Sequence, residues 1–190
     1  MQNRYSGFTL VELMVAVAIL AIVAALAAPA MQTFVSRSNM RGISADFTLA
    51  MQRARTEAIN RNECVGICQS SSADASNPKC TSSGQNWGVG WIVFSLPRCS
   101  AVGTGTPSFT ATPPEVILFL HEGFSPRYLL NNSASVHSVV FNARGASNLS
   151  TARFDLIDSQ AQASDAVVNR TFCMDMAGRI QTKAYGDACP

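Results

Sequence analysis

Six cysteines are the residues of this chain whose chemistry is easiest to infer from type and spacing. They are Cys64, Cys68, Cys80, Cys99, Cys173 and Cys189. An even number of cysteines, all outside the apolar N-terminal block, favours disulfides formed in an oxidising compartment such as the periplasm. The alternative is a zinc site, which is the weaker interpretation because the sequence has no C-x2-C pair and its two histidines lie far from the cysteines. We therefore expect disulfides and no metal.

One carboxylate stands out because of its surroundings. Glu12 lies within residues 8–28, a stretch that is otherwise almost entirely apolar. As a helix, this stretch would be about 32 Å long, enough to cross the hydrocarbon core of a bilayer. Arg4 on its N-terminal side favours a cytoplasmic location for that end. A carboxylate in lipid is costly and is usually retained for a function.

Three interpretations of this N-terminal segment compete. A secretory signal cut after Ala28-Pro29-Ala30 fits the small residues there. However, the charge of Glu12 and a helical pattern that continues beyond the tripeptide count against it. A plain single-span anchor leaves Glu12 without a role. The third interpretation rests on the residues that surround Glu12.

The segment Gly7-Phe8-Thr9-Leu10-Val11-Glu12 follows a short polar leader at 1–7 and closely resembles the processing site of type IV prepilins and type II secretion pseudopilins. The resemblance implies that a prepilin peptidase cuts between Gly7 and Phe8, and that Phe8 becomes the N-methylated first residue. Glu12 is then expected to pair with the N-terminal ammonium of a neighbouring subunit, because a buried carboxylate needs a partner. Such a pair would set the axial register of a filament.

Pro29 directly follows the apolar run. Inside a helix, a proline removes one hydrogen bond and kinks the axis, although it can also mark a helix end. Beyond it, apolar residues recur every three to four positions, which predicts an amphipathic continuation to about Arg61. These residues are Ile43, Phe47, Ala50, Met51, Ala54 and Ala58. We expect one kinked helix of roughly 80 Å, with its arginines on a solvated face rather than a DNA-binding one.

From Cys64 onward, short β-type segments alternate with loops rich in Ser, Asn, Gly and Pro. Seven strands are expected, at Cys64–Gln69, 87–94, 116–121, 136–142, 152–157, 167–174 and 179–183. Residues 175–178 are typical of a tight turn between the last two strands. Strands without intervening helices imply an antiparallel sheet, here curled on the second half of the helix.

Six cysteines permit fifteen disulfide connectivities. The positions of the expected strands reduce this number. If Cys64–Gln69 and the strand at 87–94 are antiparallel neighbours, the start of the first lies near the end of the second, which brings Cys64 close to Cys99. The next two cysteines flank the intervening loop, and the last two would join the C-terminal tail to its strand. The hypothesis is Cys64–Cys99, Cys68–Cys80 and Cys173–Cys189.

Four further blocks narrow the resemblance. They are Arg53-x-Arg55-x-Glu57-Ala58-x-x-Arg61-Asn62, Gly88-Val89-Gly90-Trp91-Ile92-Val93-Phe94, Val140-Phe141-Asn142-Ala143-Arg144-Gly145 and Gly178-Arg179-Ile180. With the N-terminal motif, they are similar to the GspH/FimT (FimU-like) family of minor pilins and minor pseudopilins, although alone they also fit core strands, turn glycines and surface charge. The resemblance implies an α+β pilin fold: a long kinked N-terminal helix, transmembrane in its first half, packed on an antiparallel β-sheet head.

The expected organisation follows from these segments. It is a prepilin leader at 1–7, a transmembrane or filament-core helix at 8–28, an amphipathic helix half at 29–62 and a periplasmic β-rich head at 63–190. The expected location is the bacterial inner membrane, crossed once, and then a periplasmic or extracellular filament. The expected partners are other pilin or pseudopilin subunits, the prepilin peptidase and the inner membrane.

The resemblance implies a structural subunit that primes or caps assembly of a type IV pilus or a type II secretion pseudopilus. The alternative is a tip-located adhesin or DNA-uptake receptor on the same scaffold. Nucleic acid is not an expected partner, since the net charge is only +2 and Gln181 stands where the DNA-binding members carry the second arginine of a Gly-Arg-x-Arg element.

Nothing in the sequence predicts catalysis. It contains no nucleophile elbow, no phosphate-binding loop and no carboxylate–histidine cluster with ligand spacing. His121 is interpreted as a surface pair with Glu122, and His137, at the start of an expected strand, as structural. We therefore expect that the chain is not an enzyme and binds no cofactor.

Overall fold

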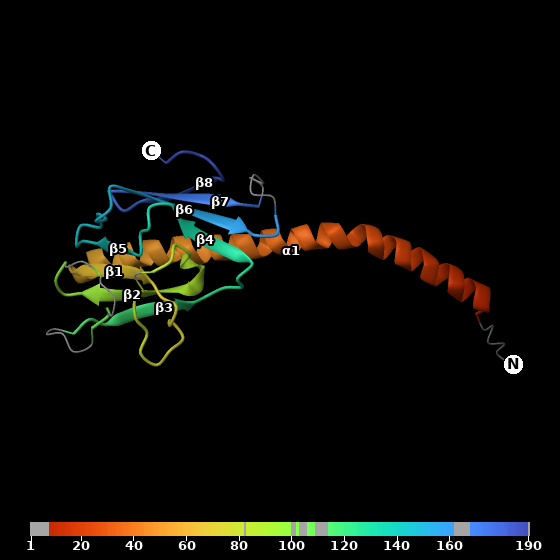
Figure 1. Ribbon diagram of the computed structural model, residues 1–190, viewed down its shortest axis with the longest axis horizontal. Helices are drawn as coiled ribbons and strands as arrows, with labels where there is room; N and C mark the ends of the chain where they lie inside the picture. Colours follow the sequence, from red (N-terminus) through yellow and green to blue (C-terminus); the bar gives the residue numbers. More distant parts are fainter. Residues whose placement is uncertain are drawn as a thin grey trace, which may run out of the picture. The chain divides into compact units, whose positions relative to one another are not determined.

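The computed structural model describes residues 8–81, 83–99, 102, 106–108, 114–161 and 168–189. Within these ranges, one long helix is followed by a 3-10 turn and eight strands (Figure 1). The elements are α1 (Leu10–Arg61), β1 (Cys64–Gln69), η1 (Trp87–Val89), β2 (Gly90–Leu96), β3 (Ile117–Glu122), β4 (Tyr128–Asn132), β5 (Ser138–Phe141), β6 (Thr151–Asp158), β7 (Arg170–Asp175) and β8 (Ile180–Ala184). The expected leader at 1–7 lies outside the described residues.

Helix α1 begins and ends close to the residues expected from the sequence. It runs through Pro29 without a break in its helical assignment, while the kink expected there stays a prediction. Its C-terminus is closed by Asn62, whose φ of 54° is the left-handed conformation that ends many helices. The N–H of Asn62 donates to the carbonyl of Ile59 at 3.3 Å, and the N–H of Glu63 donates to that of Ala58 at 3.2 Å. These two bonds form a Schellman motif.

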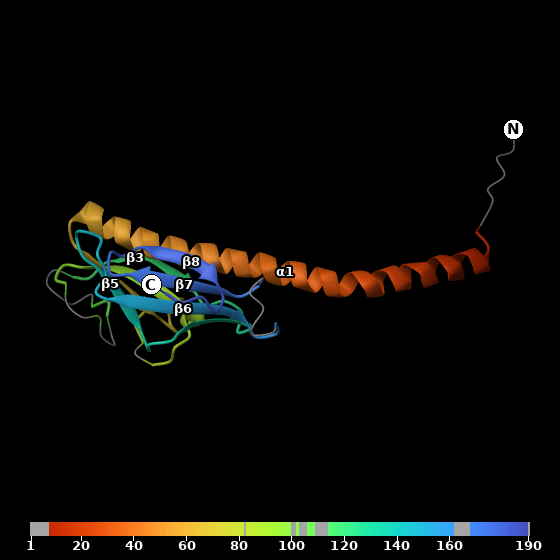
Figure 2. The same ribbon diagram turned by 90° about the horizontal axis from the view of Figure 1, so that it is seen from above.

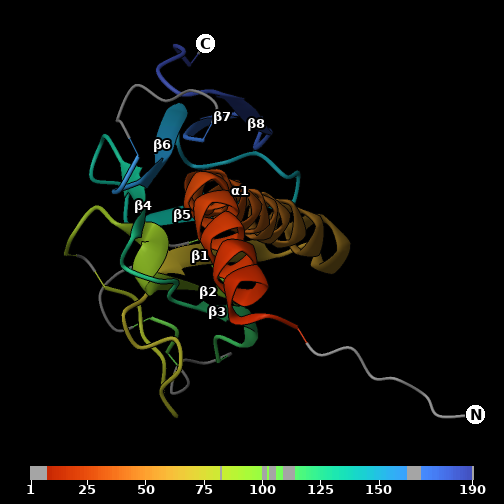
Figure 3. The same ribbon diagram turned by 90° about the vertical axis from the view of Figure 1, so that its right-hand side faces the viewer.

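The strands form two antiparallel sheets of four, in the orders β3-β2-β1-β5 and β4-β6-β7-β8. The expected α+β fold with an antiparallel β head is confirmed, but its strands divide between two sheets instead of forming one. The count of seven strands was too low, because β4 was not predicted. Figure 3 shows the sheets as separate layers, with β6, β7 and β8 at the top and β1, β2 and β3 at the bottom. Figure 2 shows their strands running roughly along the C-terminal half of α1.

Two of the expected strand positions need a smaller correction. The segment expected as a strand at 87–94 begins instead with the 3-10 turn η1, because the side chain of Asn86 accepts a hydrogen bond from the N–H of Gly88 and caps the turn. Strand β5 is shorter than the expected 136–142. The turn expected at 175–178 is present, with the N–H of Gly178 donating to the carbonyl of Asp175 at 2.9 Å.

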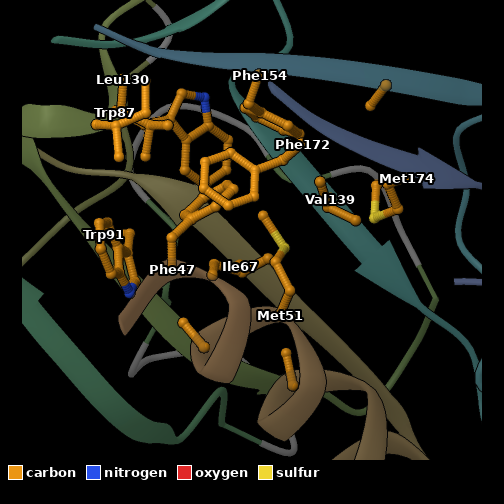
Figure 4. Packing of buried hydrophobic residues seen from close by; sticks show 14 of the residues in the cluster. Phe47, Met51, Ile67, Trp87, Trp91, Leu130, Val139, Phe154, Phe172 and Met174 are labelled. Atoms are coloured by element: carbon orange, nitrogen blue, oxygen red, sulfur yellow. The ribbon is translucent and has the colours of Figure 1, made fainter. Parts of the chain in front are cut away.

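The chain divides into two compact units, Met1–Asn39 and Met40–Pro190. In the second unit, the apolar stripe expected on the helix is buried at all six positions. Phe47 lies at the centre of the core, with its ring in edge-to-face contact with Trp87, Trp91, Phe154 and Phe172 (Figure 4). These four partners come from η1, β2, β6 and β7, so one helical side chain contacts both sheets.

Three disulfides close the second unit. They are Cys64–Cys99, Cys68–Cys80 and Cys173–Cys189, with Cα–Cα distances of 5.3, 5.6 and 5.4 Å. These are the pairs expected from the sequence. The antiparallel register of β1 and β2, which places Cys64 opposite Leu96, brings Cys64 close to Cys99, which lies shortly after the end of β2.

Candidate functional site

The first turn of α1 contains a reciprocal cap that joins Thr9 and Glu12. The backbone N–H and the hydroxyl of Thr9 each donate to Glu12 Oε2 at 2.9 Å. In return, the N–H of Glu12 donates to the Thr9 hydroxyl at 3.2 Å. This arrangement is a capping box, which satisfies N–H groups that an open helix end leaves without partners.

Sequence reasoning missed this local role of Glu12, although the signal was present. A threonine followed three residues later by a glutamate, just before an apolar run, is the signature of a capping box. Glu12 therefore has an intramolecular partner in the single chain. Its second oxygen, Oε1, takes no hydrogen bond from the described part of the chain, which leaves one acceptor atom at the helix start for a donor from elsewhere.

The other residues expected at the N-terminal site are only partly described. Gly7 lies outside the described residues, and Phe8 is 90% exposed immediately ahead of the cap. Nearly every large apolar side chain from Phe8 to Val35 is exposed, including Leu10 at 73% and Leu26 at 76%. By length and composition, α1 is the one helix among the described residues that could cross a membrane.

The two histidines have environments that the sequence did not reveal. His121 does not pair with the carboxylate of Glu122; its Nδ1 faces the Glu122 backbone carbonyl, and its Nε2 lies 3.6 Å from Asp46 Oδ2 on α1. Its ring also stacks on Trp91 at 4.2 Å. His137 directly precedes β5, and its carbonyl accepts from Gln69 N–H at 2.9 Å. Both histidines thus contact neighbouring elements of the head.

Metal binding finds no support in the described ranges. No group of three or more His, Cys, Asp or Glu side chains converges there in a way that could hold an ion. The six cysteines are all engaged in disulfides, so they are not available as thiolate ligands.

A polar groove lies at the end of the head where α1, the β5–β6 connection and the β7–β8 turn meet. Its volume is about 460 Å³. The residues that line it are Gln52, Arg55, Thr56, Gly178, Arg179, Ile180 and Gln181. We call it the Arg55 groove. Its lining includes residues from two of the four blocks singled out in the sequence, the one at 53–62 and the one at 178–180, which lie far apart along the chain.

A long apolar helix with a capped carboxylate at its first turn, followed by a disulfide-closed antiparallel β head, defines a type IV pilin-like protein. Residues 44–173 match the family model of the Type II transport protein GspH, and residues 2–28 match the prokaryotic N-terminal methylation motif. Because the first match spans more than half of the sequence, the chain belongs to the GspH family.

Solved structures give the same fold. Two crystal structures of the type IV minor pilin FimU from Pseudomonas aeruginosa superpose with TM-scores of 0.52 and 0.55, at 19% and 21% sequence identity. The matches cover 78% and 82% of this chain, and 95% and 96% of the FimU chains. At this identity, the similarity shows a shared pilin fold.

Curated relatives match over a shorter stretch. The chain is 36% identical over 81 residues to the type IV major alpha-pilin of Moraxella bovis, and 38% identical over 74 residues to a fimbrial protein of Moraxella nonliquefaciens. These matches cover 43% and 38% of this chain. The chain spans about half the length of these relatives, at 50% and 46%.

Proposed function

We propose that this chain is a structural subunit that primes or caps assembly of a filament, as a minor pilin of a type IV pilus or a minor pseudopilin of a type II secretion pseudopilus. The observation that carries the proposal is the start of α1, where one carboxylate stands at the head of an exposed apolar helix. A helix of this composition must be covered by lipid or by other apolar helices, since so much exposed apolar surface is unfavourable in water.

The proposed location follows from the same helix. Residues 8–28 would cross the inner membrane, residues 29–62 would form the amphipathic half, and the disulfide-closed head at 63–190 would lie in the periplasm. Disulfides are maintained in that compartment and are rare in the cytosol, which supports this orientation. The leader at 1–7 would remain in the cytoplasm, where the prepilin peptidase would remove it and methylate Phe8.

Glu12 would then have two successive partners. In the single chain, Thr9 satisfies one carboxylate oxygen through the capping box. In a filament, the N-terminal ammonium of an adjacent Phe8 would bind the carboxylate and neutralise its charge in the apolar core. A cation is preferred there, because Thr9 supplies hydrogen bonds without compensating the charge.

The experiment is a set of three substitutions in the native host, read by the mass of the N-terminus and by immunoblots of the filament fraction. Gly7→Val should leave the leader attached, because a bulky residue blocks the cleavage position. Glu12→Ala should be processed normally but incorporated at least about tenfold less, the factor expected for loss of about 1.4 kcal/mol.

The matched control is Glu57→Ala. Glu57 is another helical glutamate of α1, but it forms an exposed i,i+4 ion pair with Arg61, which contributes little. We expect its processing and incorporation to remain at the wild-type level. Normal processing of Gly7→Val together with normal incorporation of Glu12→Ala would refute the proposal.

A further inference from the structure

Three segments that are distant in the sequence are locked together at one point of the head. Arg55 Nε on α1 donates to the carbonyl of Gly145, in the β5–β6 connection, at 3.0 Å. Gly178, in the β7–β8 turn, packs so closely that a Cβ there would overlap the Gly145 carbonyl oxygen. Both glycines have left-handed φ values, 78° and 72°, which other residues rarely adopt. The glycines therefore allow the two turns to pack against each other while the first of them contacts Arg55.

The consequence of this packing is a guanidinium held in a fixed position. Arg55 is half-buried, and its Nε bond to a backbone carbonyl orients the side chain without neutralising it. Within the described residues, no carboxylate lies in ion-pair distance of Arg55. Its two terminal nitrogens retain donors that can bind a carboxylate in a bidentate manner.

The other residues that line the Arg55 groove also favour binding of an anion. Arg179 lines it as a second cation, although Asp175 already binds its guanidinium at 2.9 Å. Gln52 and Gln181 add amide groups, and Ile180 adds an apolar contact. None of the lining residues carries a negative charge. A partly desolvated cation surrounded by neutral hydrogen-bonding groups favours an anion.

We propose that the Arg55 groove binds a carboxylate side chain on an acidic segment of a neighbouring pilin-type subunit. This inference rests on the proposed function, which supplies the neighbouring subunits. A peptide fits better than a nucleic acid, because one uncompensated arginine in a groove of this size permits few phosphate contacts. The bound carboxylate would give Arg55 the ion-pair partner that it lacks among the described residues.

The direct test uses full-length protein in detergent micelles, with isotope-labelled arginine side chains followed by NMR. The probe is a tetraglutamate peptide, and tetraglutamine is its neutral control. Tetraglutamate should shift the Arg55 Nε–Hε signal in a saturable manner, and tetraglutamine should not. Absence of a saturable shift with tetraglutamate would overturn the inference.

A matched pair of variants tests the site itself. Gln181→Glu places a carboxylate in the groove, where it should occupy Arg55 and weaken tetraglutamate binding about tenfold. Thr182→Glu adds the same charge at the next residue of β8, which is also exposed but does not line the groove. We expect near wild-type binding for Thr182→Glu. Equal loss in both variants would overturn the inference, because it would indicate a general charge effect.

The same pair can be introduced into the native host. Gln181→Glu should reduce incorporation into filaments several-fold, and Thr182→Glu should not. If Glu12→Ala blocks assembly while Gln181→Glu assembles normally, the inference fails and the proposed function stands. If Glu12→Ala and Gly7→Val both behave as wild type, the proposed function fails. Tighter binding of a 20-nucleotide single-stranded DNA than of tetraglutamate, lost in Gln181→Glu, would overturn the inference in favour of a nucleic-acid site.

Discussion

Phe47 is a central residue of the head, because it is fully buried and its ring contacts four other aromatic rings from η1 and from both sheets. Replacing it with alanine removes these contacts and leaves a cavity that a rigid sandwich cannot fill. We expect Phe47→Ala to lower the free energy of unfolding by about 3–5 kcal/mol. Denaturant unfolding of the oxidised protein, followed by tryptophan fluorescence, measures this loss.

The control for this substitution is Phe47→Leu, which retains most of the apolar volume. It should lower the free energy of unfolding by about 1–2 kcal/mol. Equal effects of alanine and leucine would contradict the cavity as the source of the loss, because both substitutions remove the aromatic ring and only alanine removes most of the volume. A loss below about 1 kcal/mol in Phe47→Ala would show that the surrounding side chains can close the space.

Single residues also show what the sequence could predict. The burial of Phe47 follows from helical periodicity, and the Cys64–Cys99 pair follows from the antiparallel neighbours β1 and β2. The environment of His121 could not be predicted, because Asp46 and Trp91 approach it from distant segments of the chain. The orientation of Arg55 was equally hidden, since it depends on the close approach of two glycine turns.

The β7–β8 turn is an element whose stability should depend on pH, because it contains the Asp175 carboxyl. The hydrogen bond from the backbone N–H of Arg179 lowers the pKa of the Asp175 carboxyl from its ordinary value of 3.8, and the Arg179 guanidinium acts in the same direction. A carboxyl whose pKa is lowered by folding stabilises the fold above its unfolded pKa. This stabilisation is lost as the pH falls through the folded pKa, which means below about pH 4.

We therefore expect Asp175→Asn to be slightly less stable than the wild type at pH 7, by about 1 kcal/mol or less, because the pair is largely exposed. The difference should shrink as the pH falls from 4 to 2. Urea unfolding of both proteins across this range measures it. A difference that is constant from pH 7 to pH 2 would contradict the role of the charged carboxylate.

At the level of elements, local patterns predicted the positions of most strands, but they did not predict how the strands are divided between the two sheets. Strand β1 has the bounds expected from the sequence, since its apolar residues are bounded by a helix end and a polar loop. Strand β4 was missed because its last residues, Asn131 and Asn132, do not have the composition of a strand. In the structure, the Asn132 side chain instead accepts N–H groups of the following turn and donates to Arg153 O, which secures β4 beside β6.

For the whole molecule, the main limit of sequence reasoning was the division of the strands between two sheets. The apolar pattern of a strand indicates which of its faces is buried, but it does not indicate which other strand it pairs with across a long connection. The aromatic residues from η1, β2, β6 and β7 meet around Phe47, which contacts all four of them. The long helix could be predicted because its apolar and amphipathic patterns are continuous. The arrangement of the two sheets could not be predicted, because it depends on packing around Phe47.

The distribution of exposed and buried side chains along α1 predicts where the chain can be truncated without loss of folding. Large apolar side chains are exposed up to Val35, and the first buried residue of the second unit is Met40. A fragment of residues 36–190 therefore loses no core side chain, and Ser36 is a favourable N-cap for the shortened helix. We expect this fragment to be soluble without detergent, to form the three disulfides and to unfold in one transition. A fragment of residues 52–190 is the control, and it should fail to fold because it lacks Phe47 and Met51. Aggregation of the longer fragment, or cooperative folding of the shorter one, would show that the core does not depend on the second half of α1 as its packing indicates.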